Sequence, residues 1–299
     1  MARMVELLMN RVPSRAGRAR LARVASFLGA ALATSHQSMS AQVSPSTRGP
    51  VQLRLHPRVG DTLHTRLDQE IETSGAQGTG TVQRIMTTSV VVQARTIVQA
   101  SRATSTTVLT VVDSADVHSS DARGAALAEK AGRDLRGQRL ELQLAEDGSV
   151  QSARDSRGVA VSRQVAEAMA AMPPVFPHRA VSVGDRWERE MPLPSGGPIG
   201  ARASAHVRAG FRLDSLGRNG EIAYVSMHGE IVPDEQPKGL QLDGNVSGSI
   251  RVDRVRGWLT ESRFSILMKS IFTPPAASGM SPMHFVTRVT QHLWTMDKR

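Results

Sequence analysis

Apolar and polar residues alternate along much of the chain, with the period of two that is typical of β-strands. In residues 137–154, Leu140, Leu142 and Leu144 alternate with polar neighbours before Glu146-Asp147-Gly148 turns the chain. An Asp-Gly pair between two such segments predicts a hairpin. Segments 79–100 and 103–112 are rich in Thr and Val, which favour strands. Further strands are expected at 60–72, 183–191, 202–214, 220–232, 246–256, 257–272 and 283–296.

Two segments have helical rather than strand spacing. Ala122–Arg133 is short and rich in alanine. In Val159–Met172 the apolar residues recur every three to four positions, and the prolines that follow would end a helix. The pattern therefore predicts a mainly β, antiparallel protein with one or two helices.

The chain also repeats two short patterns in the same order. Val59-Gly60-Asp61-Thr62-Leu63 returns as Val183-Gly184-Asp185-Arg186-Trp187, each at the start of an expected strand. Gly148–Arg154 and Gly257–Arg263 share one pattern of residue types: a glycine, any residue, an aliphatic residue, two polar residues, a small residue and an arginine. We interpret the two patterns as a pair of pseudo-repeats. The alternative is a coincidence among residues that are common in β-turns.

This interpretation divides the chain into five parts. Residues 1–40 form a signal peptide, 41–50 a flexible leader, 51–155 the first β-rich half, 156–175 a helix with a proline-rich linker, and 176–299 the second half, packed with the first as one domain. All nine aromatic residues after residue 40 lie at or beyond Phe176. The second half is therefore the expected place for a large core or a ligand cavity.

The N-terminal segment has the order of an export signal. Six arginines and one glutamate precede an uncharged, mostly apolar run from Val24 to Ala33, and small residues follow at Ser38 and Ser40. Cleavage near Ser40–Gln42 would leave a soluble periplasmic or secreted protein, with translation starting at Met1, Met4 or Met9. The alternative is an interfacial helix, since ten apolar residues are fewer than the roughly 20 that span a bilayer.

Cleavage would also change the charge balance. The full chain carries 37 Lys and Arg against 27 Asp and Glu, a net charge of +10; without residues 1–40 the counts are 31 and 26, a net charge of +5. The remaining basic residues are dispersed among acids, which argues against a nucleic-acid partner. The chain contains no cysteine, so thiol catalysis, cysteine-ligated metals and a lipid anchor on cysteine are excluded.

With the preceding helix and Pro177, the segment Val183-Gly184-Asp185-Arg186-Trp187 resembles a group of uncharacterised bacterial envelope proteins. Their layout is similar to the lipoprotein-carrier superfamily, in which a strongly curved antiparallel sheet forms a half-open barrel around helices. The resemblance covers most of residues 51–296 and rests on short structural motifs. Leu63 stands where the motif has tryptophan, so the first repeat has diverged. The resemblance implies this fold and a lipid or other apolar ligand.

Residues with metal-binding or catalytic chemistry do not form a recognised motif. Asp113, Asp116, His118 and Asp121 lie close enough in sequence to bind calcium or zinc. We favour a solvated turn in which Asp121 caps the following helix. The nearest match to a nucleophile elbow, Gly244–Gly248, is one residue off the pattern. We therefore predict no catalytic residue, metal or cofactor, although a Ser/His/Asp set from distant segments remains an alternative.

The residues of the two Val-Gly-Asp motifs have a structural explanation. Gly60 and Gly184 allow the positive φ of a tight turn, and Asp61 and Asp185 can accept backbone hydrogen bonds there. Trp187 is expected to pack at the rim of the barrel.

The candidate binding surface is apolar. It consists of strand 257–272 together with the final strand 283–296 and comprises Trp258, Phe264, Ile266, Met268, Phe272 and Trp294. On the final strand, Phe285, Val289 and Leu293 lie on one side, and Val286 and Trp294 on the other. If the helix at 159–172 fills the concave face, these residues form a core; if the face is open, they line a pocket for an acyl chain.

We therefore expect a non-catalytic exported envelope protein that binds a lipid or other apolar ligand. The alternatives are a protein–protein adaptor of the envelope, with an exposed apolar patch or sheet edge, and a hydrolase.

Overall fold

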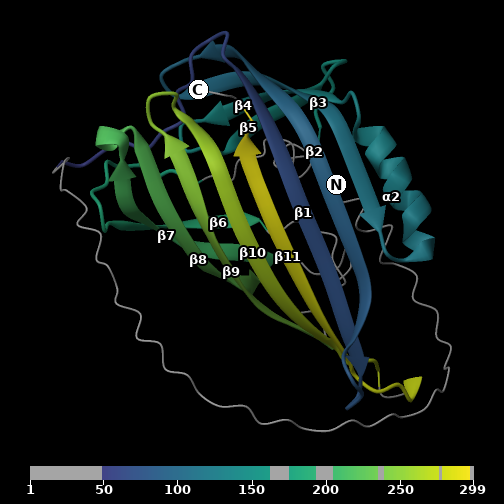
Figure 1. Cartoon of the computed structure of the whole chain (residues 1–299). Coiled ribbons are helices and arrows are strands. Elements are labelled where there is room, and N and C mark those ends of the chain that lie inside the picture. The colour runs from purple at the N-terminus through teal and green to yellow at the C-terminus, as the bar shows by residue number, and fades with distance from the viewer. Residues whose placement is uncertain (1–48, 162–174, 193–204, 235–238, 276–277, 297–299) are drawn as a thin grey trace, which may run out of the picture.

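One antiparallel sheet of eleven strands makes up most of the molecule (Figure 1). The structure is a computed structural model, and it describes residues 49–161, 175–192, 205–234, 239–275 and 278–296. The strands are β1 Thr62–Gln77, β2 Gln83–Ser101, β3 Ser105–Ser119, β4 Arg139–Ala145, β5 Val150–Asp155, β6 Arg186–Pro192, β7 Ala205–Gly217, β8 Ile222–Pro233, β9 Leu240–Asp253, β10 Trp258–Phe272 and β11 Met283–Thr295. Every strand that the sequence predicts is present.

The sheet is curved and does not close into a barrel. Its order is β5-β4-β3-β2-β1-β11-β10-β9-β8-β7-β6, so the two edges, β5 and β6, are consecutive in the chain. Strands β1 and β11 pair over thirteen positions from Thr65↔Thr295 to Gln77↔Met283, which joins the two halves in one sheet. The predicted curved antiparallel sheet or half-open barrel is confirmed.

The two Val-Gly-Asp segments fold into the same turn. Gly60 and Gly184 have φ of +91° and +95°, where a side chain would be strained. Asp61 Oδ2 accepts the amide of Arg58 at 3.3 Å, and Asp185 Oδ2 accepts that of Ser182 at 2.9 Å. Each glycine amide donates to a carbonyl on the next strand, at 2.8 Å and 2.7 Å. The motif therefore opens β1 and β6 in the same way, as the pseudo-repeat predicts.

The second repeated pattern also lies at matching places. Gly148 and Gly257 both have positive φ and lie in the turns that lead into the returning strands β5 and β10. Strands β1–β5 thus correspond in order to β6–β10, and β11 lies between β1 and β10.

Helix α2 (Ala122–Leu135) lies beside the end of β3 that β4 does not reach (Figure 1). Asp121 caps it by accepting the amide of Gly124 at 3.0 Å, as predicted. Ala128 of the helix packs with Val90 and Val117 in a small second core. The helix therefore covers apolar residues that the short strand β4 leaves without a neighbour.

The predicted turn at residues 113–121 is wrong, because β3 continues to Ser119. Ala115 and Val117 are buried and paired with β2, Asp116 and His118 take the alternate positions of the strand, and Asp113 lies at a register shift. Asp116 pairs with Arg136 at 2.9 Å. Since the four polar residues are spread along a strand and its end, they do not converge on one point.

The predicted helix at 159–172 is wrong at its start. Residues 159–161 are extended beside β5: Asp155 N donates to Val159 O at 2.9 Å and Val161 N to Ala153 O at 3.1 Å. The Asp155 carboxylate accepts the amides of Arg157 and Val159, which fixes the turn between the two segments. These backbone hydrogen bonds, that of Val159 first, hold the pKa of Asp155 below its usual value. Residues 162–172 lie outside the described part of the chain.

The main core draws on both halves and lies on one face of the sheet, which we call the inner face. Leu53, Leu142, Phe176 and Phe211 are almost fully buried in it. Trp187 stacks on Phe211 with ring centroids 5.7 Å apart, and its indole N–H donates to Val175 O at 2.8 Å. The predicted packing role of Trp187 is therefore observed in these contacts.

Candidate functional site

Strand register places four of the six candidate apolar residues on the inner face. Phe264, Ile266, Met268 and Phe272 alternate along β10 on the side of the core residue Ile250 of β9. Opposite them on β11 lie Gln291, Val289, Thr287 and Met283, in that order. The next strand, β1, continues these rows with Gln69, Ile71, Thr73 and Gln77. Residues more than two hundred positions apart therefore form one surface.

The other two candidate residues do not belong to this surface. The alternation breaks at a register shift between Leu259 and Glu261, and Trp258 is buried in the main core beyond that shift. Trp294 pairs with Glu261 and Arg66, whose side chains project from the opposite, outer face. The sequence-based grouping of Trp294 with Phe264 is therefore wrong, because each residue of β11 alternates in side and Trp294 is out of phase with Val289.

The middle rows of the inner face are half-buried, although rows on both sides are buried. We call the half-buried residues the inner band; they are Gln69, Ile71, Phe264, Ile266, Val289 and Gln291. Toward one end lie Ser262 and Leu293, and toward the other Met268 and Thr287, all under a tenth exposed. The inner band is thus a strip of four apolar side chains with two amides in the row next to Ser262 and Leu293, where Gln69 Nε2 donates to Gln291 Oε1 at 3.5 Å.

Two buried hydroxyl groups flank the inner band. Ser262 lies two residues before Phe264 on β10, and Thr88 of β2 is paired with Ile71. Both residues are at least nine-tenths buried, and neither hydroxyl has a hydrogen-bond partner among the residues that the structure describes. A buried hydroxyl left without a partner costs about 1–3 kcal/mol. By contrast, Thr73 and Thr287, one row further on, hydrogen-bond each other at 3.4 Å.

Sequence reasoning missed the residues that β1 contributes to the inner band. The alternation of Leu67, Gln69 and Ile71 predicts a strand with one apolar face, but it does not identify the neighbouring strand. The pairing of β1 with β11 supplies that information.

The outer face carries a cluster of charged and aromatic residues around Glu261. One carboxylate oxygen accepts from His292 Nε2 at 3.0 Å and from Arg263 at 2.8 Å, and the other lies 3.2 Å from Arg251. Burial raises the pKa of Glu261, but the hydrogen bond from His292 and the charges of the two arginines outweigh it and hold the pKa below its usual value. The carboxylate is therefore saturated with partners, which suits a structural role.

The same cluster explains the position of Trp294. Its ring stacks on that of His292 at 4.3 Å between centroids, and the Arg66 guanidinium lies 5.5 Å from its centroid. Cation–π and stacking contacts of this kind contribute about 0.5–1 kcal/mol each at exposed sites. Trp294 is thus engaged by its neighbours on the outer face.

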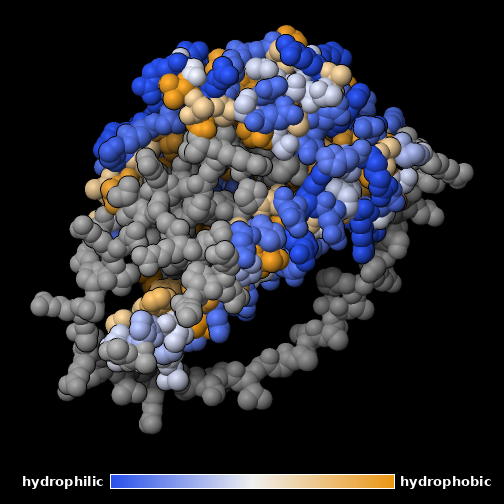
Figure 2. All heavy atoms as spheres, turned by 180° about the vertical axis from the view of Figure 1, so that it is seen from behind, coloured by the Kyte–Doolittle hydropathy of each residue, from blue (hydrophilic) through white to orange (hydrophobic). Residues whose placement is uncertain are grey.

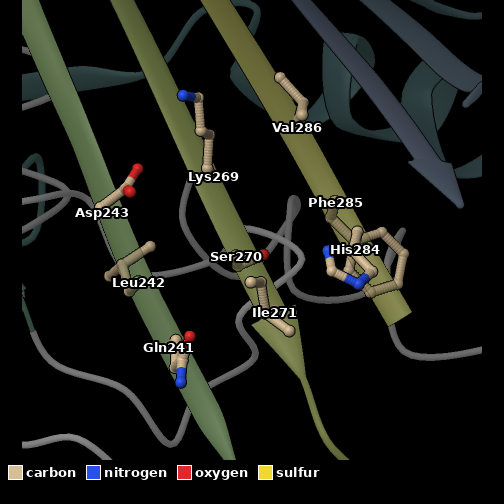
Figure 3. Close-up of a pocket in the computed structure, with 9 residues that line it drawn as sticks. All are labelled: Gln241, Leu242, Asp243, Lys269, Ser270, Ile271, His284, Phe285 and Val286. Carbon is tan, nitrogen blue, oxygen red and sulfur yellow. The ribbon is translucent and has the colours of Figure 1, made fainter. Parts of the chain in front are cut away.

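A hollow of about 410 Å³ lies further along the outer face of β9, β10 and β11 (Figure 3). The polar lining residues on this face are Gln241, Asp243, Lys269 and His284, and Figure 3 shows Ile271 between the flanking strands. Lys269 lies opposite Asp243 in the strand register, so the cation faces a carboxylate. Among the residues that the structure describes, no three His, Asp or Glu side chains group closely enough to hold a metal ion.

Comparison with known proteins identifies no family. No family model matches the chain, and no curated protein sequence matches it. Solved structures with some likeness to the chain include DynF from the dynemicin biosynthesis pathway of Micromonospora chersina, with 10% identity over 83% of this chain and 86% of that one and a TM-score of 0.24. The outer membrane protein OprG from Pseudomonas aeruginosa has 9% identity over 81% and 98% and a TM-score of 0.23. Likenesses at such TM-scores support no inference about function.

The described helix is too short and too polar to cross a membrane.

Proposed function

We propose that the protein is an exported, non-catalytic binding protein that holds an apolar ligand against the inner band. The observation that carries this proposal is the pair of unpartnered buried hydroxyls, Thr88 and Ser262, on either side of a half-buried apolar strip. A face built as pure core would bury Ile71, Phe264 and Ile266 as completely as Leu293.

The chemistry of the inner band defines the class of ligand. Its apolar side chains favour a hydrocarbon such as an acyl chain, because burial stabilises by about 25 cal/mol per Å² of apolar surface. The hydroxyls of Thr88 and Ser262 and the amides of Gln69 and Gln291 favour a ligand that also carries an oxygen acceptor. A fatty acid or an acyl ester combines both features.

The location follows from the sequence rather than from the fold. The order of basic, apolar and small residues in positions 1–42 supports export and cleavage near Ser40–Gln42. The resemblance to the lipoprotein-carrier superfamily supports an envelope protein with an apolar ligand. Both remain part of the proposal.

An adaptor role would use the free edges of the sheet, and these edges are protected. Strand β6 has seven residues, carries exposed Arg186, Glu188 and Glu190, and ends at Pro192. Charges and proline on a short edge strand disfavour pairing with another chain. Residues 159–161 already contact the other edge strand, β5, through Arg154↔Ala160. The edges of the sheet therefore give no support to an adaptor role.

The test measures ligand binding by the purified full chain. Native mass spectrometry followed by lipid extraction should reveal a bound acyl compound, and a fluorescent fatty acid should bind and be displaced by it. Replacing Ile266 by tryptophan should fill the inner band and weaken binding at least tenfold. Leu267→Trp changes the neighbouring residue on the outer face and should bind normally. Absence of both a bound compound and fatty-acid uptake would refute the proposal.

A further inference from the structure

Two hairpins end together at one tip of the molecule (Figure 1). The first is β1 and β2, and the second is β10 and β11; β1 and β11 remain paired as far as Gln77↔Met283. Beyond the strands, Gly78 N donates to Pro282 O at 2.8 Å, which ties the two turns to each other. The tip is therefore one surface built from two distant segments.

Large apolar side chains are exposed at this tip. They are Val82 (59%), Ile85 (49%), Phe272 (38%) and Met280 (52%). Ile85 and Phe285 both approach Gly75, where an added Cβ would lie 2.6 Å and 3.1 Å from their side chains. Phe272 is paired with Met283, two residues before Phe285. Ile85, Phe272 and Phe285 therefore gather at the end of the inner face, and Val82 and Met280 lie in the two turns beyond it.

The same two segments contain almost no charge. Residues 73–85 and 270–287 make up 31 positions, of which Arg84 is the sole Asp, Glu, Lys or Arg, whereas 21% of the whole chain is charged. Arg84 is neutralised by Glu72 at 2.7 Å. Figure 2 shows the tip at its lower left in pale blue, white and orange tones, whereas deep blue residues lie among orange and white ones over the upper part of the view. Among its described residues, the tip therefore has no unpaired charged side chain that could bind an oppositely charged group of a protein partner.

We propose that this tip inserts into the surface of a lipid bilayer. Exposed apolar side chains on a rigid, uncharged projection match the interfacial region of a membrane, where apolar groups are buried and paired strand ends remain hydrated. Lys269 lies three residues before Phe272, about 10 Å along the strand. At that distance its ammonium group would reach the headgroup level while Phe272 contacts the acyl chains.

The charges near the tip determine the kind of bilayer. Lys269 faces Asp243, and Arg84 is paired with Glu72, so the tip has no excess of basic groups for anionic lipid. Docking is therefore driven by apolar burial, and zwitterionic phosphatidylcholine suffices. The inference goes beyond the proposed ligand binding and does not require it, although the inner band and the tip lie on the same face of β10.

The experiment uses the absence of cysteine from the full chain. An environment-sensitive fluorophore is attached to Met280→Cys at the tip or to Val183→Cys, which is equally exposed (52%) at the opposite end of the sheet. Phosphatidylcholine vesicles should shift the emission of the label at 280 to the blue at both low and high salt. The label at 183 should not respond. No shift at 280, or equal shifts at both positions, would overturn the proposal.

Vesicle flotation provides the second measurement. The double variant Ile85→Ser/Met280→Ser should lower the bound fraction by about tenfold or more. The control Val59→Ser/Val183→Ser changes exposed valines at the other end and should float like the unchanged protein. Fatty-acid binding without vesicles should be retained by the tip variant, so that failure of docking and failure of ligand binding are distinguishable.

Discussion

Replacing Trp187 by phenylalanine removes one hydrogen bond and keeps an aromatic ring. The indole N–H donates to Val175 O at 2.8 Å, and Val175 is 1% exposed. Removal of the donor from a buried carbonyl costs about 1–3 kcal/mol, and the smaller ring loses up to about 1 kcal/mol more of packing. The stacking on Phe211 is retained. We therefore expect Trp187→Phe to lower the free energy of unfolding by about 2–3 kcal/mol.

Thermal and urea unfolding measure this loss. For a domain of this size, the expected destabilisation lowers the melting temperature by about 4–12 °C. Trp258 and Trp294 remain as fluorescent reporters of unfolding, one in the core and one on the outer face. Coincident transitions for fluorescence and far-UV circular dichroism would justify the two-state treatment.

Tyr224→Phe is the matched control, because it also removes one polar atom from an aromatic ring. Tyr224 is 43% exposed, so its variant should stay within about 0.5 kcal/mol of the unchanged protein. Equal stability of Trp187→Phe and the unchanged protein would refute the structural role of the motif. So would a loss of fatty-acid binding by Trp187→Phe without any loss of stability.

Three further predictions concern the outer face, the inner face and α2. Folding lowers the pKa of Glu261, so this carboxylate stabilises the fold above its usual pKa of 4.5, and the stabilisation is lost as pH falls through the lowered pKa. Urea unfolding between pH 6 and 3 should therefore show a smaller decrease in the free energy of unfolding for Glu261→Gln than for the unchanged protein. Gly248→Ala would place a Cβ 2.4 Å from Arg263 O and 2.5 Å from Phe264 Cδ1. It should destabilise by about 1–3 kcal/mol and disturb ligand binding, measured by unfolding and fatty-acid titration. Asp121→Ala removes the cap of α2 and should cost about 1 kcal/mol, with faster hydrogen exchange confined to the first turn of the helix.

Local patterns were sufficient where the chain makes contacts with its sequence neighbours. The hairpin at Asp147-Gly148, the cap at Asp121 and the turns at Gly60 and Gly184 all depend on a few adjacent residues, and the sequence predicts each of them. The sequence predicts a turn at 113–119 because Ala115 and Val117 are its only apolar residues, and two such residues do not form a clear strand pattern. Burial against β2 and α2 decides that β3 continues there.

The candidate site depends on pairing that no local pattern contains. The amides of Gln69 and Gln291 meet although 222 positions separate them. The sequence identifies Phe264, Ile266 and Met268 as one face, but not the strand β1 that completes it. The error over Trp294 has the same origin: an aromatic residue on a neighbouring strand was grouped by type, whereas the register assigns it to the other side.

The order of strands has a consequence for how the protein is made. Strands that are neighbours in the sheet are also consecutive in the chain, except for β1 and β11, which pair in the middle of the sheet. Synthesis proceeds from the N-terminus, so β1 is complete long before its second partner exists. Until β11 emerges, a strand of sixteen residues has one open edge, which is the usual starting point for aggregation. The growing chain thus depends on protection of the open edge of β1 until β11 pairs with it.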